Sequence, residues 1–248
     1  MSSSNATAQP PAIRAYLGGS FDPVHKGHLQ MAMTVYERLA PLAAQLGRPI
    51  QVALMPTARS PFKDRSTDAR QRLAMLTLAT HLTPIDICTD ELWQEPPVYT
   101  INTVKALRAQ YPNDTLIFIM GSDSAASLPR WKQGLELTDF VHLWIFARQA
   151  DRPGHQANDT AHLVSALPES LQAKVTDNVL DLLTINDNDL KAWAGGRIYR
   201  DNTEIVAVSS SEVRAALASS DSAALQSALP PIVYDYIAEQ RLYCHANG

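Results

Sequence analysis

Residues 18–29 read Gly-Gly-Ser-Phe-Asp-Pro-Val-His-Lys-Gly-His-Leu. This pattern predicts a strand that ends in a glycine loop and is followed by a helix. Gly18 and Gly19 have no Cβ atom, so the backbone can adopt unusual φ and ψ angles and a ligand can come close to it. The first turn of the helix offers N–H groups without intrahelical acceptors and a partial positive charge. We therefore expect a phosphate group to bind at this corner.

His25 and His28 are three residues apart, which places their side chains on one face of a helix. A neutral imidazole donates one hydrogen bond and a protonated ring adds positive charge, so two adjacent rings can hold phosphate oxygens. The alternative is a strand-to-helix turn whose histidines simply face solvent. The Gly-Gly, Asp-Pro and Gly-His pairs around the histidines favour phosphate binding.

Other ligand motifs do not fit the chain. The glycines do not follow G-x-G-x-x-G, and no G-x-x-x-x-G-K-[ST] segment occurs, so the dinucleotide fingerprint and the P-loop are both absent. The H-x-x-H spacing lacks the glutamate and the four-residue step of an H-E-x-x-H zinc site. Cys88 and Cys244 form no CxxC pair.

Composition limits the class of protein. The chain has 248 residues, enough for one large core, and we expect one domain at residues 12–245 after a disordered tail at residues 1–11. The tail lacks the basic and apolar segments of a signal peptide, and no apolar stretch approaches the ~18 residues of a membrane span. The net charge of −4 and the pI of 5.9 argue against nucleic acid as a partner. Two distant cysteines indicate free thiols, so we expect a cytoplasmic protein without membrane partners; its oligomeric state is not indicated.

Short β-rich runs alternate with helical patterns. Strands are expected at residues 13–17, 50–55, 85–88, 116–120, 141–146 and 205–208. Helices are expected at residues 29–46, 68–82 and 100–109, with further helical segments within 167–183. Pro41 lies inside the first helix, where proline bends or breaks helical structure. Residues 116–120 are apolar on both faces, as in a strand covered by helices on two sides. The expected fold is α/β, a Rossmann-like doubly wound parallel sheet with ligands at the carboxyl ends of its strands.

Further blocks follow residues 18–29 along the chain. Residues 98–104 read Val-Tyr-Thr-Ile-Asn-Thr-Val, residues 121–124 read Gly-Ser-Asp-Ser, and residues 128–131 read Leu-Pro-Arg-Trp. Residues 208–214 read Val-Ser-Ser-Ser-Glu-Val-Arg. In type and order these blocks resemble the signatures of the nucleotidyltransferases with an H-x-G-H motif and, among them, of the nicotinate-nucleotide adenylyltransferase family. The resemblance covers nearly the whole chain.

The resemblance implies adenylyl transfer. The 5′-phosphate of nicotinate mononucleotide would attack the α-phosphorus of ATP, giving nicotinate adenine dinucleotide and pyrophosphate in a step of NAD biosynthesis. In such a reaction the enzyme must align the two phosphates and neutralise the charge on the leaving pyrophosphate. Its side chains need to form few or no covalent bonds with the substrates. His25, His28 and Arg214 are the implied catalytic residues. Mg²⁺ is expected to arrive with ATP, bound by phosphate oxygens and water, so we predict no dedicated metal ligands.

The same resemblance assigns residues to the two substrates. The implied ATP-binding residues are Gly18, Gly19, Ser20, Phe21, His25, His28, Lys63, Gly121, Asp123, Ser209, Ser210 and Arg214. The implied residues for the nicotinate nucleotide are Thr100, Trp131 and Lys132. Four of these assignments have structural alternatives: a solvated surface side chain for Lys63, a surface arginine for Arg214, a helix cap for Asp123 and a buried core side chain for Trp131.

The chain departs from the family pattern mainly on the acceptor side. Val98 stands where a serine is usual, Asn102 where an aspartate is usual, and Lys132 where an aromatic residue is frequent. Asn102 in place of an aspartate removes a negative charge, and Lys132 adds a positive one. Both changes favour an acceptor that carries a carboxylate, if the two side chains face the pocket. The alternatives are nicotinamide mononucleotide or phosphopantetheine as the acceptor, and a non-catalytic ATP sensor with the same fold. A dehydrogenase ranks last, because its glycine fingerprint is absent.

Overall fold

Seven parallel strands form one sheet in this computed structural model, in the order β3-β2-β1-β4-β5-β7-β6. The structure describes residues 10–58, 67–147, 167–184, 195–219 and 222–243. The strands are β1 (Ile13–Gly19), β2 (Ile50–Pro56), β3 (Ile85–Ile87), β4 (Thr115–Gly121), β5 (His142–Phe146), β6 (Val175–Thr176) and β7 (Ile198–Asp201). The helices are α1 (Lys26–Gln45), α2 (Ala69–Thr80), α3 (Thr100–Gln110), α4 (Ser122–Ala126), α6 (Glu169–Gln172), α7 (Ser210–Ser219), α8 (Ser222–Ala228) and α9 (Pro231–Glu239), with 3₁₀ helices η1 (Leu128–Arg130), η2 (Gly134–Asp139) and η3 (Val179–Leu182). The expected doubly wound α/β fold is confirmed.

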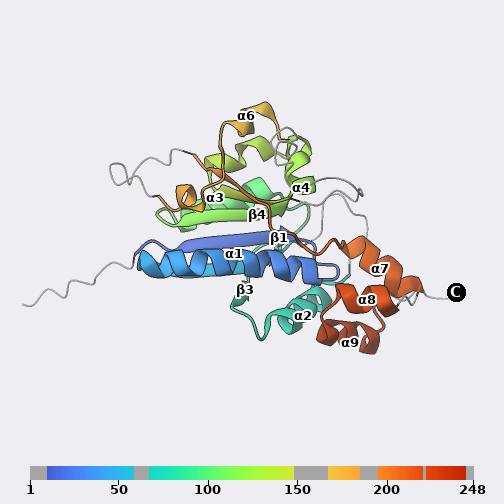
Figure 1. The fold of residues 1–248 in the computed structure, drawn as a ribbon. Helices are drawn as coiled ribbons and strands as arrows, with labels where there is room; N and C mark the ends of the chain where they lie inside the picture. Colours follow the sequence, from blue (N-terminus) through green and yellow to red (C-terminus); the bar gives the residue numbers. More distant parts are fainter. Residues whose placement is uncertain (1–9, 59–66, 148–166, 185–194, 220–221, 244–248) are drawn as a thin grey trace, which may run out of the picture.

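Helices cover both faces of the sheet, with α1 on one side and α3 and α4 on the other (Figure 1). Side chains of β1 alternate between the two sides: Ile13 and Leu17 belong to a core shared with α1, α2 and α9, whereas Tyr16 belongs to a second core shared with α3 and α4. A strand buried on both faces has no polar side, which explains the continuous apolar run in β4.

The strand order reverses between β1 and β4. These strands pair in parallel with Leu17 beside Ile119, while β2 and β3 extend the sheet from β1 and the remaining strands extend it from β4. β1 ends at Gly19 and β4 ends at Gly121, so both glycines lie at the same edge of the sheet. In open α/β sheets a ligand binds outside the carboxyl ends of the strands at such a reversal. The fold thus places the predicted glycine corner at this ligand-binding position.

The prediction of a strand at residues 205–208 is wrong. The strand in this part of the chain is β7, which pairs with β5 and β6. The segment after β7 crosses α1 instead, where the Gln30 side chain donates to the Glu204 carbonyl at 2.8 Å and accepts from the Val206 N–H at 2.7 Å. These side-chain bonds satisfy backbone groups that a strand would pair with a neighbouring strand.

The expected helices mostly have the expected bounds. α1 continues through Pro41 to its end at Gln45, and Asp68 caps α2 by accepting from the Arg70 N–H at 2.8 Å. Residues 167–183 are less helical than expected, because they contain only the short helices α6 and η3 with β6 between them. No helix in the described part of the chain is long and apolar enough to cross a membrane.

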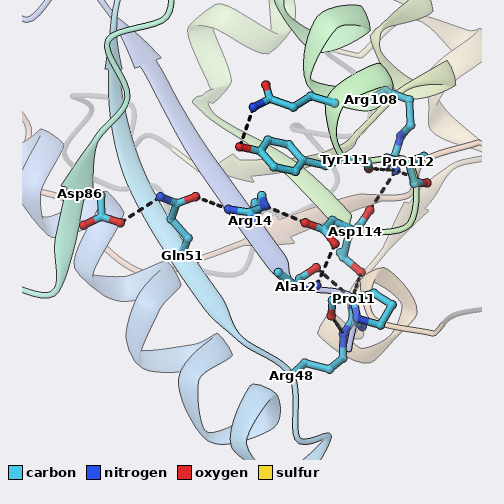
Figure 2. Close-up of polar contacts among 12 residues, drawn as sticks. Pro11, Ala12, Arg14, Arg48, Gln51, Asp86, Arg108, Tyr111, Pro112 and Asp114 are labelled. Atoms are coloured by element: carbon cyan, nitrogen blue, oxygen red, sulfur yellow. Dashed lines mark hydrogen bonds and ion pairs between the residues drawn. The ribbon is translucent and has the colours of Figure 1, made fainter. Parts of the chain in front are cut away.

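A polar network joins the amino ends of β1, β2 and β4 (Figure 2). Asp114 accepts from the Ala12 N–H at 2.9 Å and from Arg14 Nε at 2.7 Å. Arg14 also donates to Gln51 at 2.7 Å, and its guanidinium lies 4.0 Å from the centroid of the Tyr111 ring. The network holds the sheet at the edge opposite to the predicted ligand site.

Candidate active site

The glycine corner at the end of β1 is closely packed. A Cβ atom on Gly18 would lie 2.5 Å from Cζ of Phe118, and one on Gly19 would lie 3.1 Å from Cζ of Phe21. Phe21 has a φ of 46°, in the left-handed region that bulky residues rarely adopt. The close approach of the Phe118 ring is the reason for glycine at position 18, but Gly18 and Gly19 lie within β1 and neither has a positive φ. The sharp turn toward α1 is made at Phe21, so the prediction of unusual backbone angles at the two glycines is wrong.

The two histidines stack on each other at the start of α1. Their ring centroids are 3.6 Å apart with an interplanar angle of 23°, and Phe21 packs edge-on against His28 at 4.8 Å. His25 is buried with 5% exposure, and His28 is half-buried. The alternative of two histidines facing solvent is therefore wrong.

A hydrogen bond selects the tautomer of His28. The backbone N–H of His25, the N-cap residue of α1, donates to His28 Nδ1 at 3.3 Å. An imidazole nitrogen that accepts a hydrogen bond carries no proton, so the neutral ring has its proton on Nε2. The remaining nitrogen of His28 is thus a donor suited to an anionic oxygen.

The N-terminus of α7 packs against the turn that precedes these histidines. Ser209 and Glu212 form a reciprocal cap: the Ser209 N–H donates to Glu212 Oε2 at 2.6 Å, and the Glu212 N–H donates to Ser209 Oγ at 3.2 Å. Ser210 Oγ donates to the Pro23 carbonyl at 2.9 Å, and Arg214 donates to the Asp22 carbonyl at 2.7 Å. Two blocks nearly 190 residues apart in sequence are thus joined at one turn.

Two buried polar residues that the sequence analysis did not single out support this turn. Asp22 is 3% exposed; burial favours a raised pKa for its carboxyl, but hydrogen bonds from Thr67 and Tyr243, together with the charge of Arg214, hold that pKa below its usual range. Arg72, 1% exposed, donates to the Ser20 carbonyl and to the Thr57 carbonyl, both at 2.8 Å. Arg72 thereby fixes the loop after β1 against the loop after β2.

Asp123 and Gly121 lie at the end of β4, beside the glycine corner. Gly121 is the N-cap residue of α4, and Asp123 lies inside the first turn of that helix with an exposed side chain. The alternative in which Asp123 caps α4 is therefore wrong. A Cβ atom on Gly121 would meet no atom within 4 Å, so the space above the end of β4 is open.

One contact brings the predicted acceptor residue Lys132 to the start of α3, where Thr100 lies. Lys132 Nζ lies 4.5 Å from the centroid of the Tyr99 ring, and Tyr99 directly precedes Thr100, the first residue of α3. Trp131 is half-buried beside the second core, and its Nε1 donates to Ser127 Oγ at 2.8 Å. The loop of Trp131 and Lys132 thus lies against the N-terminus of α3, where positive helix charge and N–H groups are available to an anion.

Glu91 connects this acceptor region to the loop after β2. It is 6% exposed and accepts from Thr103 Oγ1 of α3 at 2.5 Å. Burial raises the pKa of the Glu91 carboxyl, while hydrogen bonds from Thr103 and Thr57 oppose the rise. Glu91 was not identifiable from the sequence, because its partners come from separate elements.

One predicted phosphate-binding residue, Lys63, lies outside the described residues. Within the described ranges, no three His, Cys, Asp or Glu side chains gather in a metal-binding group. The donors that surround the corner are imidazole, guanidinium and backbone N–H groups, which are suited to phosphate oxygens.

A parallel sheet with a glycine corner and a histidine pair at its strand reversal has the features of a nucleotide-binding site. A family model described as Cytidylyltransferase-like matches residues 16–216. A protein of Idiomarina loihiensis named "Probable nicotinate-nucleotide adenylyltransferase" is 36% identical over 233 residues, which cover 93% of this chain and 99% of that protein. A protein of the same name from Psychromonas ingrahamii is 35% identical over 230 residues, covering 92% and 95%. The chain therefore belongs to the nicotinate-nucleotide adenylyltransferase family within the cytidylyltransferase-like proteins.

A solved structure agrees with the fold. Plasmodium falciparum nicotinic acid mononucleotide adenylyltransferase complexed with NaAD superposes with a TM-score of 0.64 at 18% identity, covering 94% of this chain and 97% of that chain. The whole sheet and its helices thus have a counterpart in a solved structure, although the two sequences differ at most positions.

Proposed function

We propose that this protein transfers the adenylyl group of ATP to nicotinate mononucleotide, forming nicotinate adenine dinucleotide and pyrophosphate. Relatives that align over more than nine-tenths of the chain are named for this activity. The observation that carries the proposal is the joining of His25, His28 and Arg214 around one turn at the strand reversal. The reaction is a step of NAD biosynthesis.

The phosphates of ATP bind at the glycine and histidine corner in this proposal. Gly18 and Gly19 let the nucleotide come close to the backbone, and Nε2 of His28 donates to a phosphate oxygen. Arg214 lies at the same turn, where its positive charge stabilises the charge that develops on the departing pyrophosphate. Neither histidine acts as a nucleophile, because the ionised 5′-phosphate of the acceptor attacks the α-phosphorus of ATP directly. Lys63, Ser209, Ser210, Gly121 and Asp123 complete the proposed ATP site.

The nicotinate nucleotide binds between α3 and the loop after η1 in this proposal. Trp131 stacks on the pyridine ring, and the N–H groups at the start of α3 receive its carboxylate with the Thr100 hydroxyl. The position of Lys132 against Tyr99 supports this assignment, because it adds a positive charge beside the same helix end. A carboxylate is therefore favoured over a neutral amide.

ATP is expected to bind together with a divalent metal ion, and we infer Mg²⁺ as that ion. The ion would neutralise phosphate charge, with phosphate oxygens and water as its ligands. The chain's own donors at the corner are cationic or N–H groups, which fit the phosphates of such a complex. We also infer a cytoplasmic location, which the free thiol of Cys88 supports.

A product assay tests the function. The purified protein is incubated with Mg-ATP and, in separate reactions, with nicotinate mononucleotide, nicotinamide mononucleotide or phosphopantetheine, and products are separated by chromatography. We expect nicotinate adenine dinucleotide as the dominant product. A preference for another acceptor would contradict the assignment of Thr100, Trp131 and Lys132, and ATP binding without any product would favour a sensor.

Two variants test the ATP site. His28→Ala and Arg214→Ala each remove a donor to charge that develops during the reaction, so kcat should fall by about 100-fold or more. Circular dichroism should show an intact fold for both, since each side chain is only partly buried. Normal turnover in both variants would rule out the proposed roles.

A further inference from the structure

Three segments from distant parts of the chain meet at Asp22, which precedes the histidine pair by three residues. The Tyr243 hydroxyl donates to Asp22 Oδ1 at 2.6 Å, and the Thr67 N–H donates to Oδ2 at 3.2 Å. The backbone carbonyl of the same residue accepts from Arg214 at 2.7 Å. Asp22 is therefore held by contacts from the segment before α2, from α7 and from the C-terminal segment.

The charges around Asp22 favour its ionised form. Arg214 of α7 and Arg72 of α2 both interact electrostatically with the carboxylate. The hydroxyl of Tyr243 stays protonated, because burial and the neighbouring carboxylate both raise its pKa. Tyr243 is thus a permanent donor to a buried anion.

The backbone of Tyr243 is held in a costly conformation. Its φ is 63°, in the left-handed region, which a residue of this size adopts only where the surrounding structure imposes it. Two kinds of contact impose this conformation. The Leu242 N–H donates to the Ile237 carbonyl of α9 at 3.0 Å, and both Leu242 and Tyr243 pack against the core shared by β1, α1, α2 and α9. The chain turns back after α9, and the hydroxyl of Tyr243 reaches Asp22.

We propose that Tyr243 is a positioning residue for adenylyl transfer: by holding Asp22, it fixes the turn that carries His25 and His28 and the carbonyl that orients Arg214. The proposal rests on the function proposed above. The C-terminal segment thereby supports a phosphate site built from the end of β1, the start of α1 and the start of α7.

The test compares Tyr243→Phe with Tyr236→Phe in the full chain. Both variants lose one hydroxyl from the C-terminal region, but Tyr236 donates to Gln71 and not to Asp22. A hydrogen bond to a buried carboxylate is strong, so kcat/KM for ATP should fall about tenfold in Tyr243→Phe. It should be unchanged in Tyr236→Phe, and KM for the acceptor nucleotide should be unchanged in both.

The pH profile separates positioning from a general loss of stability. Without the Tyr243 donor the pKa of Asp22 rises, so kcat/KM should begin to fall at a higher pH than in Tyr236→Phe. Asp22→Asn, which cannot ionise, should remove this acid limb. Equal pH profiles and equal kcat/KM values in the two tyrosine variants would overturn the proposal.

A spectroscopic measurement keeps the inference independent of the proposed function. The imidazole ¹⁵N and ¹H resonances of His28 should shift in Tyr243→Phe and stay in place in Tyr236→Phe. If the wild-type protein made no dinucleotide, the proposed function would fail while these resonances still reported on the turn. Unchanged His28 resonances in Tyr243→Phe would overturn the positioning role in either case.

Discussion

Gly27 explains why the two histidines are separated by this particular pair of residues. A Cβ atom at position 27 would lie 3.0 Å from the Val206 carbonyl oxygen and 3.2 Å from His25 Nδ1. Only glycine lets the segment after β7 cross α1 here without moving the His25 ring. The sequence indicated a tight corner from the glycines, but not this contact, because Val206 belongs to a segment that was expected to be a strand.

Buried polar residues were the hardest to identify from sequence. His25 and His28 were found because their spacing and their glycine neighbours form a local pattern, and their placement side by side is confirmed by the stacked rings. Asp22, Arg72 and Glu91 were missed because their function depends on carbonyls and hydroxyls contributed by other elements. Local spacing carries no information about such partners.

The buried His142 should make the free energy of unfolding depend on pH. Burial, followed by the charges of Arg108 and Arg197, lowers the pKa of His142 to about 3, and its Nδ1 accepts from the Arg197 N–H at 3.0 Å. In the unfolded chain the pKa is about 6.5. Between these values only the unfolded state binds the proton, so stability is complete above about pH 6.5 and is lost as the pH falls.

The free energy of unfolding should therefore decrease by about 1.4 kcal/mol through His142 between about pH 7.5 and about pH 5.5. Urea unfolding of the wild type and of His142→Asn measures it, because asparagine can accept the same N–H without titrating. The dependence on pH should be smaller in the variant by that amount. Parallel curves for the two proteins would show that His142 binds its proton equally well in the folded and unfolded states.

Strands were predictable from the sequence where they consist of a long run of apolar residues. β1, β2, β4 and β5 were expected within one or two residues of their bounds, because strands buried on both faces have continuous apolar runs. β7 was missed, since its four residues include Arg200, paired with Asp177 at 2.7 Å, and Asp201, which accepts from Trp144 Nε1 at 3.1 Å. A strand whose charges are neutralised by tertiary contacts does not look like a strand in sequence.

Arg72 links the loops at the ends of β1 and β2, and the substitution Arg72→Lys tests this link. Besides the Ser20 and Thr57 carbonyls, the guanidinium reaches the Ala58 carbonyl at 2.6 Å and the Thr67 carbonyl at 3.1 Å. A lysine has one nitrogen and cannot reach acceptors arranged around a planar fork. Carbonyls left unpaired should destabilise the protein by about 3 kcal/mol and raise KM for ATP.

The matched control for this prediction is Arg70→Lys, an exposed residue on the same helix. Its free energy of unfolding should change by no more than about 0.5 kcal/mol. Chemical unfolding and initial-rate kinetics of both variants provide the comparison. Equal stability and equal KM values for the two would mean that the loops are fixed by other contacts.

In the whole molecule, the proposed chemistry and a network of polar contacts lie at opposite edges of the sheet. The proposed site lies at the carboxyl edge of the sheet, whereas the network of Asp114, Arg14 and Gln51 lies at the amino edge (Figure 2). β1 has seven residues, so at about 3.3 Å per residue the two edges are roughly 20 Å apart. The doubly wound fold and the edge that carries the site were predicted from strand pattern alone, whereas the network was not, because it joins three strands.

Asp114→Asn should therefore change stability without changing catalysis. The substitution keeps the shape of the side chain but removes the negative charge of the carboxylate that accepts from Arg14 Nε. The side chains of Arg14 and Asp114 are 23% and 14% exposed. We expect a loss of about 2 kcal/mol in the free energy of unfolding, measured with urea, and an unchanged kcat per folded molecule. Because the edges are far apart, combining it with His28→Ala should give additive effects on stability and the kcat of His28→Ala alone. A lower kcat in Asp114→Asn under conditions where the protein is fully folded would show that the two edges of the sheet are coupled.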